Sequence, residues 1–197
     1  MRKLHKVQIE PQALFLAALL LLTVPFRWVL AAAVAAAFHE ICHLAAIQLL
    51  GGRVWKIRIG LRGARIETEP MSYARDVLAA AAGPVGSLMT LFLAKPFPRI
   101  AFCGILQTAY NLLPILPFDG GRIVQGILYC LFPRGKADTI SRWIAVLTAM
   151  GILAVELRIG TGVLPVLLLL PVFQYWREIF LAKRREEEYN SATNQER

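Results

Sequence analysis

Charged residues are scarce in this chain of 197 residues: they make up 18% of it, whereas hydrophobic residues make up 57%. Basic residues outnumber acidic ones by 22 to 13, which gives a formal net charge of +9. A basic chain can bind nucleic acid, but these Lys and Arg residues fall in short clusters between apolar runs, where they set the orientation of membrane segments. The composition therefore predicts an integral membrane protein with several spanning segments and no nucleic-acid partner.

Cysteine is scarce as well, and internal repeats and low-complexity linkers are absent from the sequence. The three cysteines, Cys42, Cys103 and Cys130, lie in or beside apolar segments, and their spacing matches no metal-binding motif. We expect them to be small buried hydrophobic side chains. The chain is too short for a membrane bundle plus a large soluble domain, so we expect one membrane domain over residues 1–182 and a charged cytoplasmic tail over 183–197.

Six apolar segments are candidates for membrane helices. They cover residues 12–27, 28–50, 77–94, 100–131 (with a break), 143–157 and 162–182. If the N-terminus is cytoplasmic, the cytoplasmic regions carry 17 Lys and Arg residues and the outer regions carry 4. The positive-inside rule then favours six crossings with both termini in the cytoplasm. The start of the chain also resembles a signal peptide, but cleavage near residues 31–37 would destroy the second segment.

The stretch KIRIGLR at residues 56–62, between the second and third segments, alternates basic residues or glycine with apolar residues. A period of two is the signature of a half-buried strand, and Gly60 and Gly63 supply a turn. We therefore predict a small β-hairpin at the membrane surface within an otherwise all-α polytopic fold of six transmembrane helices. An ordinary basic loop bound to anionic headgroups is the alternative. The open edge of a hairpin could pair with an extended substrate segment.

The motif HEICH at residues 39–43 places three ionisable groups inside the second apolar segment. His39 and His43 lie one turn apart on a helix, so both imidazoles can reach one metal ion, and Glu40 lies beside that ion. Each such group at the centre of a membrane helix costs roughly 2.5–3.5 kcal/mol on insertion scales, so three of them indicate a function. The arrangement is that of zinc hydrolases, with two His ligands and a Glu general base. Cys42 points away from the shared face and is not expected to be a ligand.

The stretch NLLPILPFDGG at residues 111–121 breaks the fourth segment. Its two prolines stop helical hydrogen bonding, so the backbone is irregular at membrane depth. Such backbone is tolerated only where it is buried in protein or lines a wet cavity. Asp119 in this break is the candidate third metal ligand, or else a structural carboxylate paired with Arg122.

Two further features have structural explanations. The run of small residues at 79–87 in the third segment is explained by close helix packing, without a direct catalytic role. Asn111, at the start of the break, either holds a substrate strand or caps the broken helix, and the sequence does not separate these roles.

The two motifs together, HEICH and NLLPILPFDGG, resemble those of the site-2 protease family of intramembrane zinc metalloproteases. The resemblance covers residues 12 to about 182, including the basic hairpin-like stretch and the Ala-Gly-Pro helix that follows it. Within the family the chain is most similar to the stage IV sporulation protein FB group, which has six membrane segments. Members of that group process a membrane-associated precursor of a sigma factor.

The resemblance implies that His39, His43 and Asp119 are zinc ligands and that Glu40 is the catalytic base. It also implies that three further residues belong to a substrate-positioning stretch: Asn111, Pro114 and Pro117. The position before the second histidine is commonly Gly in the family and is Cys42 here, which changes local packing and removes no ligand. We expect a chain without the cytoplasmic CBS domain of the sporulation group and without the PDZ insertion of other branches.

The function that follows is hydrolysis of a peptide bond within or next to a transmembrane segment, in regulated intramembrane proteolysis. The expected partners are the lipid bilayer, a membrane-associated substrate such as a sigma-factor precursor or an anti-sigma factor, and a regulatory membrane protein. The expected location is the bacterial cytoplasmic membrane or the mother-cell-derived forespore membrane. The alternative is a membrane metal transporter or a non-catalytic metal-binding scaffold that uses the same three ligands. Transport would favour several ligand sets along a path, and the sequence shows one.

Overall fold

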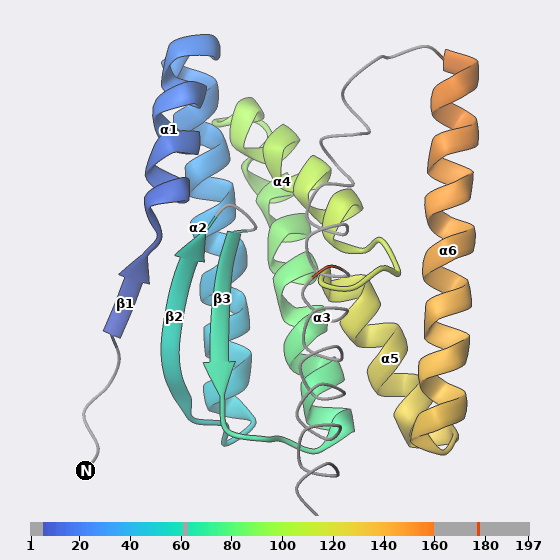
Figure 1. Cartoon of the computed structure of the whole chain (residues 1–197). Helices are drawn as coiled ribbons and strands as arrows, with labels where there is room; N and C mark the ends of the chain where they lie inside the picture. Colours follow the sequence, from blue (N-terminus) through green and yellow to red (C-terminus); the bar gives the residue numbers. More distant parts are fainter. Residues whose placement is uncertain (1–5, 61–62, 160–176, 178–197) are drawn as a thin grey trace, which may run out of the picture. The chain divides into compact units, whose positions relative to one another are not determined.

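The computed structural model of the chain describes residues 6–60, 63–159 and 177 (Figure 1). The sixth predicted segment lies outside the described residues except for residue 177, and so does the predicted tail. The chain divides into two units, Met1–Thr148 and Ala149–Arg197, and the candidate site belongs to the first. The described elements are β1 (Lys6–Ile9), α1 (Pro11–Thr23), α2 (Phe26–Leu49), β2 (Val54–Gly60), β3 (Gly63–Thr68), α3 (Tyr73–Met89), the 3-10 helix η1 (Thr90–Leu93), α4 (Pro98–Asn111), α5 (Asp119–Leu131) and α6 (Arg134–Ile159).

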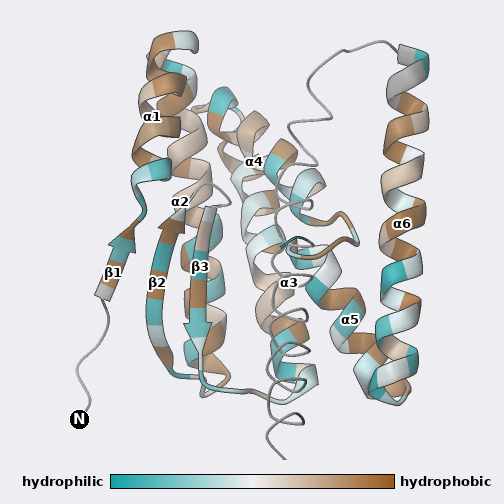
Figure 2. Ribbon diagram, in the orientation of Figure 1, coloured by the Kyte–Doolittle hydropathy of each residue, from teal (hydrophilic) through white to brown (hydrophobic). Residues whose placement is uncertain are grey.

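Three helical stretches among the described residues are long and apolar enough to cross a membrane: Phe26–Leu49, Tyr73–Leu93 and Arg134–Val155. Helix α1 is apolar but shorter, as its coloured ribbon shows (Figure 2). Together these helices indicate an integral membrane protein. The prediction of six crossings is not confirmed, because α1, α4 and α5 each have only 13 or 14 residues. The orientation of the termini stays a prediction.

Helix α3 contacts α2, α4 and α5. Its buried residues are all small or are proline: Ala79, Ala80, Gly83, Pro84, Gly86 and Ser87. Small residues let helix backbones approach closely, so the interpretation of this run as a packing surface is confirmed. At Gly86 an added Cβ would lie 2.8 Å from the Cβ of Cys42, which shows how closely α2 and α3 meet.

The predicted β-hairpin is present, and a third strand joins it. Strands β2 and β3 pair antiparallel, with Ile57 opposite Ile66, and Gly63 in the turn has a φ of +89°. Strand β1 pairs parallel with β2, with Val7 opposite Ile57, so the sheet order is β1-β2-β3. Sequence reasoning missed β1 because its alternation covers only four residues, too few to distinguish a strand from a loop. The edge of β2 is therefore already paired.

The predicted break in the fourth segment is also present. Helix α4 ends at Asn111 and α5 begins at Asp119, and the turns between them include a cis peptide bond before Pro117. The connection lies tightly against the first turn of α5, since an added Cβ at Gly121 would lie 2.6 Å from the carbonyl oxygen of Ile115. Ile115 itself is only 1% exposed. This connection, anchored by the buried Ile115 and Phe118, places Asp119 in the interior.

The prediction that the cysteines are buried was wrong. None of the three cysteines is buried: Cys42 and Cys103 are half-buried and Cys130 is exposed. An apolar side chain of a membrane helix can face lipid instead of a protein core, so hydrophobicity alone did not imply burial. Helix α6 begins at Arg134 and contains the predicted apolar segment at 143–157, and near its start Asp138 accepts a hydrogen bond from Tyr129 at 2.6 Å.

Candidate metal centre

The two motif histidines lie on the buried face of α2. Five residues spaced four apart form that face: Ala31, Ala35, His39, His43 and Ile47. His39 is 2% exposed and His43 is 5% exposed, and their ring centroids lie 4.7 Å apart. The prediction that one helical face carries both imidazoles is confirmed.

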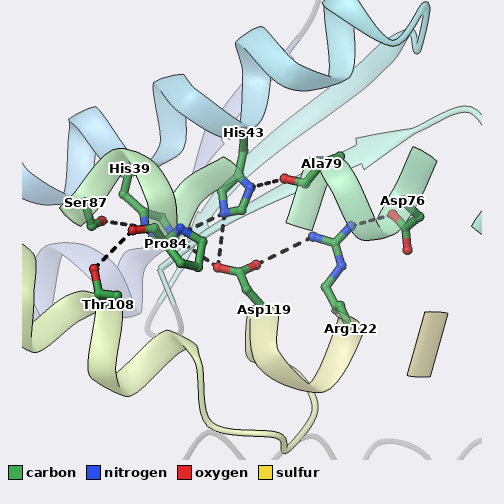
Figure 3. Close-up of polar contacts among 9 residues, drawn as sticks. All are labelled: His39, His43, Asp76, Ala79, Pro84, Ser87, Thr108, Asp119 and Arg122. Atoms are coloured by element: carbon green, nitrogen blue, oxygen red, sulfur yellow. Dashed lines mark hydrogen bonds and ion pairs between the residues drawn. The ribbon is translucent and has the colours of Figure 1, made fainter. Parts of the chain in front are cut away.

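Asp119 completes a cluster with the two histidines. Its Oδ2 lies 3.1 Å from Nε2 of His39 and 3.1 Å from Nε2 of His43, and the two Nε2 atoms are themselves 3.1 Å apart (Figure 3). A tetrahedral zinc site with Zn–N bonds of about 2.0–2.1 Å places its ligand atoms roughly 3.3 Å apart. Three buried ligand atoms therefore converge at a spacing close to that of a tetrahedral metal site.

Each imidazole forms a hydrogen bond through Nδ1 on its far side and has Nε2 toward the cluster. Nδ1 of His43 donates to the carbonyl oxygen of Ala79 at 2.7 Å, so the proton of a neutral ring lies on Nδ1 and Nε2 presents a lone pair. Nδ1 of His39 is 2.8 Å from Oγ of Ser87, which is fully buried. The lone pair on Nε2 of His43 and a carboxylate oxygen of Asp119 face one another, and they would repel unless a cation or a proton lies between them. The donor set fits a bound metal ion.

Helix α3 supplies both of these hydrogen-bond partners, and sequence reasoning missed their role. Ala79, Gly83 and Ser87 are spaced four residues apart, which places them on one face of the helix. An added Cβ at Gly83 would lie 2.8 Å from Cε1 of His39 and would overlap the ring of His43. The spacing of small residues at 79, 83 and 87 is the signal that could have indicated a helix seated against two histidines one turn apart.

The second oxygen of Asp119 faces a cation. Oδ1 lies 3.8 Å from Nη1 of Arg122, whose Nη2 is 2.7 Å from Oδ1 of Asp76 on α3. The two sequence interpretations of Asp119, as ligand and as partner of Arg122, are therefore compatible, because each uses a different oxygen. Sequence reasoning missed Asp76, which lies 46 residues from Arg122 along the chain.

The other predicted site residues lie around this cluster. Glu40 is half-buried, and its carboxylate is close enough to His39, His43 and Asp119 to interact with them electrostatically. Cys42 contacts Gly86 on α3, and the metal cluster found among the described residues consists of His39, His43 and Asp119. The predicted substrate-positioning residues are half-buried at the end of α4 and in the connection before Asp119: Asn111, Pro114 and Pro117.

Comparison with known families finds one that fits this geometry. The model of Peptidase family M50 matches residues 71–155. This region includes Asp119 and the whole of α3, but it covers less than half of the chain and excludes the two histidines. No curated protein matches the chain in a sequence search.

A solved structure shows the fold. The chain is similar to a Site-2 Protease from Methanocaldococcus jannaschii, with a TM-score of 0.65 and 19% sequence identity. The similarity covers 88% of this chain and 90% of that protein. The chain therefore has the fold of that protease, and the three converging ligand atoms are its own evidence for a metal centre.

Proposed function

We propose that this protein is an intramembrane zinc metalloprotease that hydrolyses a peptide bond within or next to a transmembrane segment of a membrane-associated substrate. The observation that carries the proposal is the buried convergence of ligand atoms from His39, His43 and Asp119. The M50 match and the fold of a site-2 protease support the same class of enzyme.

Three protein ligands leave a fourth coordination position on the metal, which a hydrolase needs for water. Two imidazoles and a carboxylate are the ligand set of catalytic zinc sites, which keep a fourth position open. A zinc ion bound there would act as a Lewis acid and lower the pKa of water to about 7. His39, His43 and Asp119 would hold the ion, and the hydrogen bonds to Ser87 and Ala79 would keep both rings in place.

Glu40 is the proposed general base. It follows His39 directly in α2, and its carboxylate lies near all three ligands. It would take a proton from the attacking water as the new C–O bond forms. It would then return that proton to the leaving amine as the C–N bond breaks.

The position of the cluster constrains the substrate. His39 precedes Leu49, the last residue of α2, by ten positions, so the centre lies roughly 15 Å from that end of the helix. A substrate helix hides its peptide bonds in its own hydrogen bonds, so we expect helix-weakening residues near the scissile bond. We propose that Asn111, Pro114 and Pro117 position the unwound segment.

The sheet is a proposed docking site for that segment. Because β1 covers the edge of β2, the edge of the hairpin that no described strand pairs with is that of β3. An extended substrate segment could add to β3 by main-chain hydrogen bonds. Docking on β3 of a three-stranded sheet replaces the earlier expectation that the substrate pairs with the open edge of a two-stranded hairpin.

The cellular setting is proposed from the resemblance alone. The substrate would be a sigma-factor precursor or an anti-sigma factor, cleaved in the bacterial cytoplasmic membrane or the forespore membrane, with a regulatory membrane partner controlling the cleavage. Both termini would be cytoplasmic, which agrees with the distribution of basic residues.

The test compares wild-type protein with Glu40→Gln in source cells and in purified form. Glu40→Gln should keep its metal content and lose turnover, at least 100-fold, because general-base catalysis typically contributes that much. Membrane-anchored fragments should accumulate only in cells with the variant. The matched control is Glu69→Gln, which changes an acid at the surface of the chain and should cleave normally.

A photo-crosslinker at Arg65 on β3 of the Glu40→Gln variant tests the docking site, because it should capture the uncleaved substrate. Undiminished cleavage by Glu40→Gln would contradict the assigned base. If neither variant causes fragments to accumulate under any growth or sporulation condition, metal flux across reconstituted vesicles is the next measurement. Metal flux carried by the protein would support the transporter alternative.

A further inference from the structure

The two oxygens of the Asp119 carboxylate face different partners. Oδ2 lies 3.1 Å from Nε2 of both His39 and His43, whereas Oδ1 lies 3.8 Å from Nη1 of Arg122 (Figure 3). Arg122 is three residues further along α5, and its other terminal nitrogen lies 2.7 Å from Asp76. The guanidinium group therefore lies between two carboxylates, one inside the cluster and one outside it.

Asp76 connects this ion pair to the helix that orients the histidines. It lies in the first turn of α3, and the same helix presents the carbonyl of Ala79 to His43 and the hydroxyl of Ser87 to His39. Helix α3 thus contacts each of the three candidate ligands, two directly and Asp119 through Arg122.

Because the two oxygens of Asp119 have different partners, they would differ in their ability to bind a metal ion. A carboxylate can bind a metal ion through one oxygen or through both. Binding through both would fill the position that a catalytic zinc site keeps open. An oxygen held by a guanidinium group would lose that ion pair if it turned toward the metal, so Arg122 favours the use of Oδ2 alone.

Stability by itself is a weak reason for the Asp76–Arg122 pair. The two side chains are 41% and 38% exposed, and ion pairs with this exposure contribute little to folding. The Asp119 carboxylate, in contrast, is 10% exposed, so a nearby cation acts on it with little screening.

We propose that Arg122, anchored by Asp76, is a positioning residue that holds Oδ1 of Asp119 and makes this residue a one-oxygen metal ligand. The inference rests on the metal site of the proposed function. It assigns a role to two residues outside the HExxH motif and the three ligands.

The test uses the full-length chain in detergent, loaded with Co²⁺, whose visible absorption is strong in four-coordinate sites and weaker when the coordination number rises. Arg122→Met should weaken the absorption and lower Co²⁺ affinity roughly 10–100-fold, as is typical for the loss of an outer partner of a metal ligand. Arg122→Lys, which keeps the charge, should restore part of both. Asp76→Asn should act in the same direction with a smaller effect, since Arg122 remains. The control, Arg53→Met, removes an arginine that is 80% exposed and should change neither quantity.

The outcomes separate this inference from the proposal on which it rests. A wild-type chain that binds no Co²⁺ would contradict the metal site itself. Wild-type and Arg122→Met proteins with the same affinity and the same spectrum would overturn the role of Arg122 and leave the metal site in place. If Arg122→Met does not fold, Arg122→Lys and Asp76→Asn decide: wild-type spectra and affinities in both would overturn the inference.

Discussion

At the scale of single residues, Gly83 shows how closely the site is fitted together. It lies on α3 between Ala79 and Ser87, and it faces the imidazoles of His39 and His43. The two imidazole rings cannot move away from a side chain at residue 83 without losing their hydrogen bonds to α3. The absence of a side chain at residue 83 is therefore as much a part of the metal centre as the ligands are.

Gly83→Ala should lower metal affinity at least tenfold and destabilise the fold by about 1–3 kcal/mol, because the new Cβ overlaps both rings. Competition with a chelator and thermal unfolding measure the two effects. Gly151→Ala is the matched control, since it is also a Gly-to-Ala change within a helix and an added Cβ there meets nothing within 4 Å. Equal metal affinity in both variants would contradict the close fit.

At the scale of elements, the small sheet has two unlike faces. Val7 and Ile9 share a face with their partners Ile57 and Ile59 on β2, and three of these four are exposed. Gln8 lies on the opposite face, opposite Arg58. We therefore expect this exposed apolar face to contact lipid.

We expect a tryptophan at Ile9 to be quenched by lipids brominated in their acyl chains, and a tryptophan at Gln8 to be quenched much less. The two positions are neighbours on β1 and point to opposite faces, so the native tryptophans contribute the same background to both variants. Fluorescence of the two variants in vesicles measures the difference. Equal quenching would mean that the apolar face does not meet the membrane.

At the scale of the whole molecule, the metal ion would join separate helices. The ligands come from α2 and α5, and both histidines are also held by α3. A metal that binds only the folded chain stabilises it, by about 2.7 kcal/mol when the free ion is 100-fold above its dissociation constant.

Removal of the metal by a chelator should therefore lower the unfolding temperature of the wild-type chain, and zinc should restore it. Glu40→Gln should show the same shift because the ligands are intact, whereas His39→Ala should show almost none. Thermal unfolding in detergent with and without chelator gives the comparison. An equal shift in His39→Ala would place the stabilising metal somewhere else.

Local patterns in the sequence were enough to predict several parts of this protein. The spacing of His39 and His43, the break around Pro114 and Pro117, and the alternation in β2 depend only on the period of a helix or strand and on the chemistry of proline. The structure confirms all three. Asp119 was a candidate ligand for the same reason, since it follows the break.

Only the tertiary structure decided which distant residues meet. The pairing of β1 with β2, the bonds of Ser87 and Ala79 to the histidines, and the line from Asp76 through Arg122 to Asp119 all join elements far apart in the sequence. Such contacts depend on how closely helices pack, which here is set by small residues such as Gly83 and Gly86. The period of a helix predicts which face a residue occupies, and packing alone determines what that face meets.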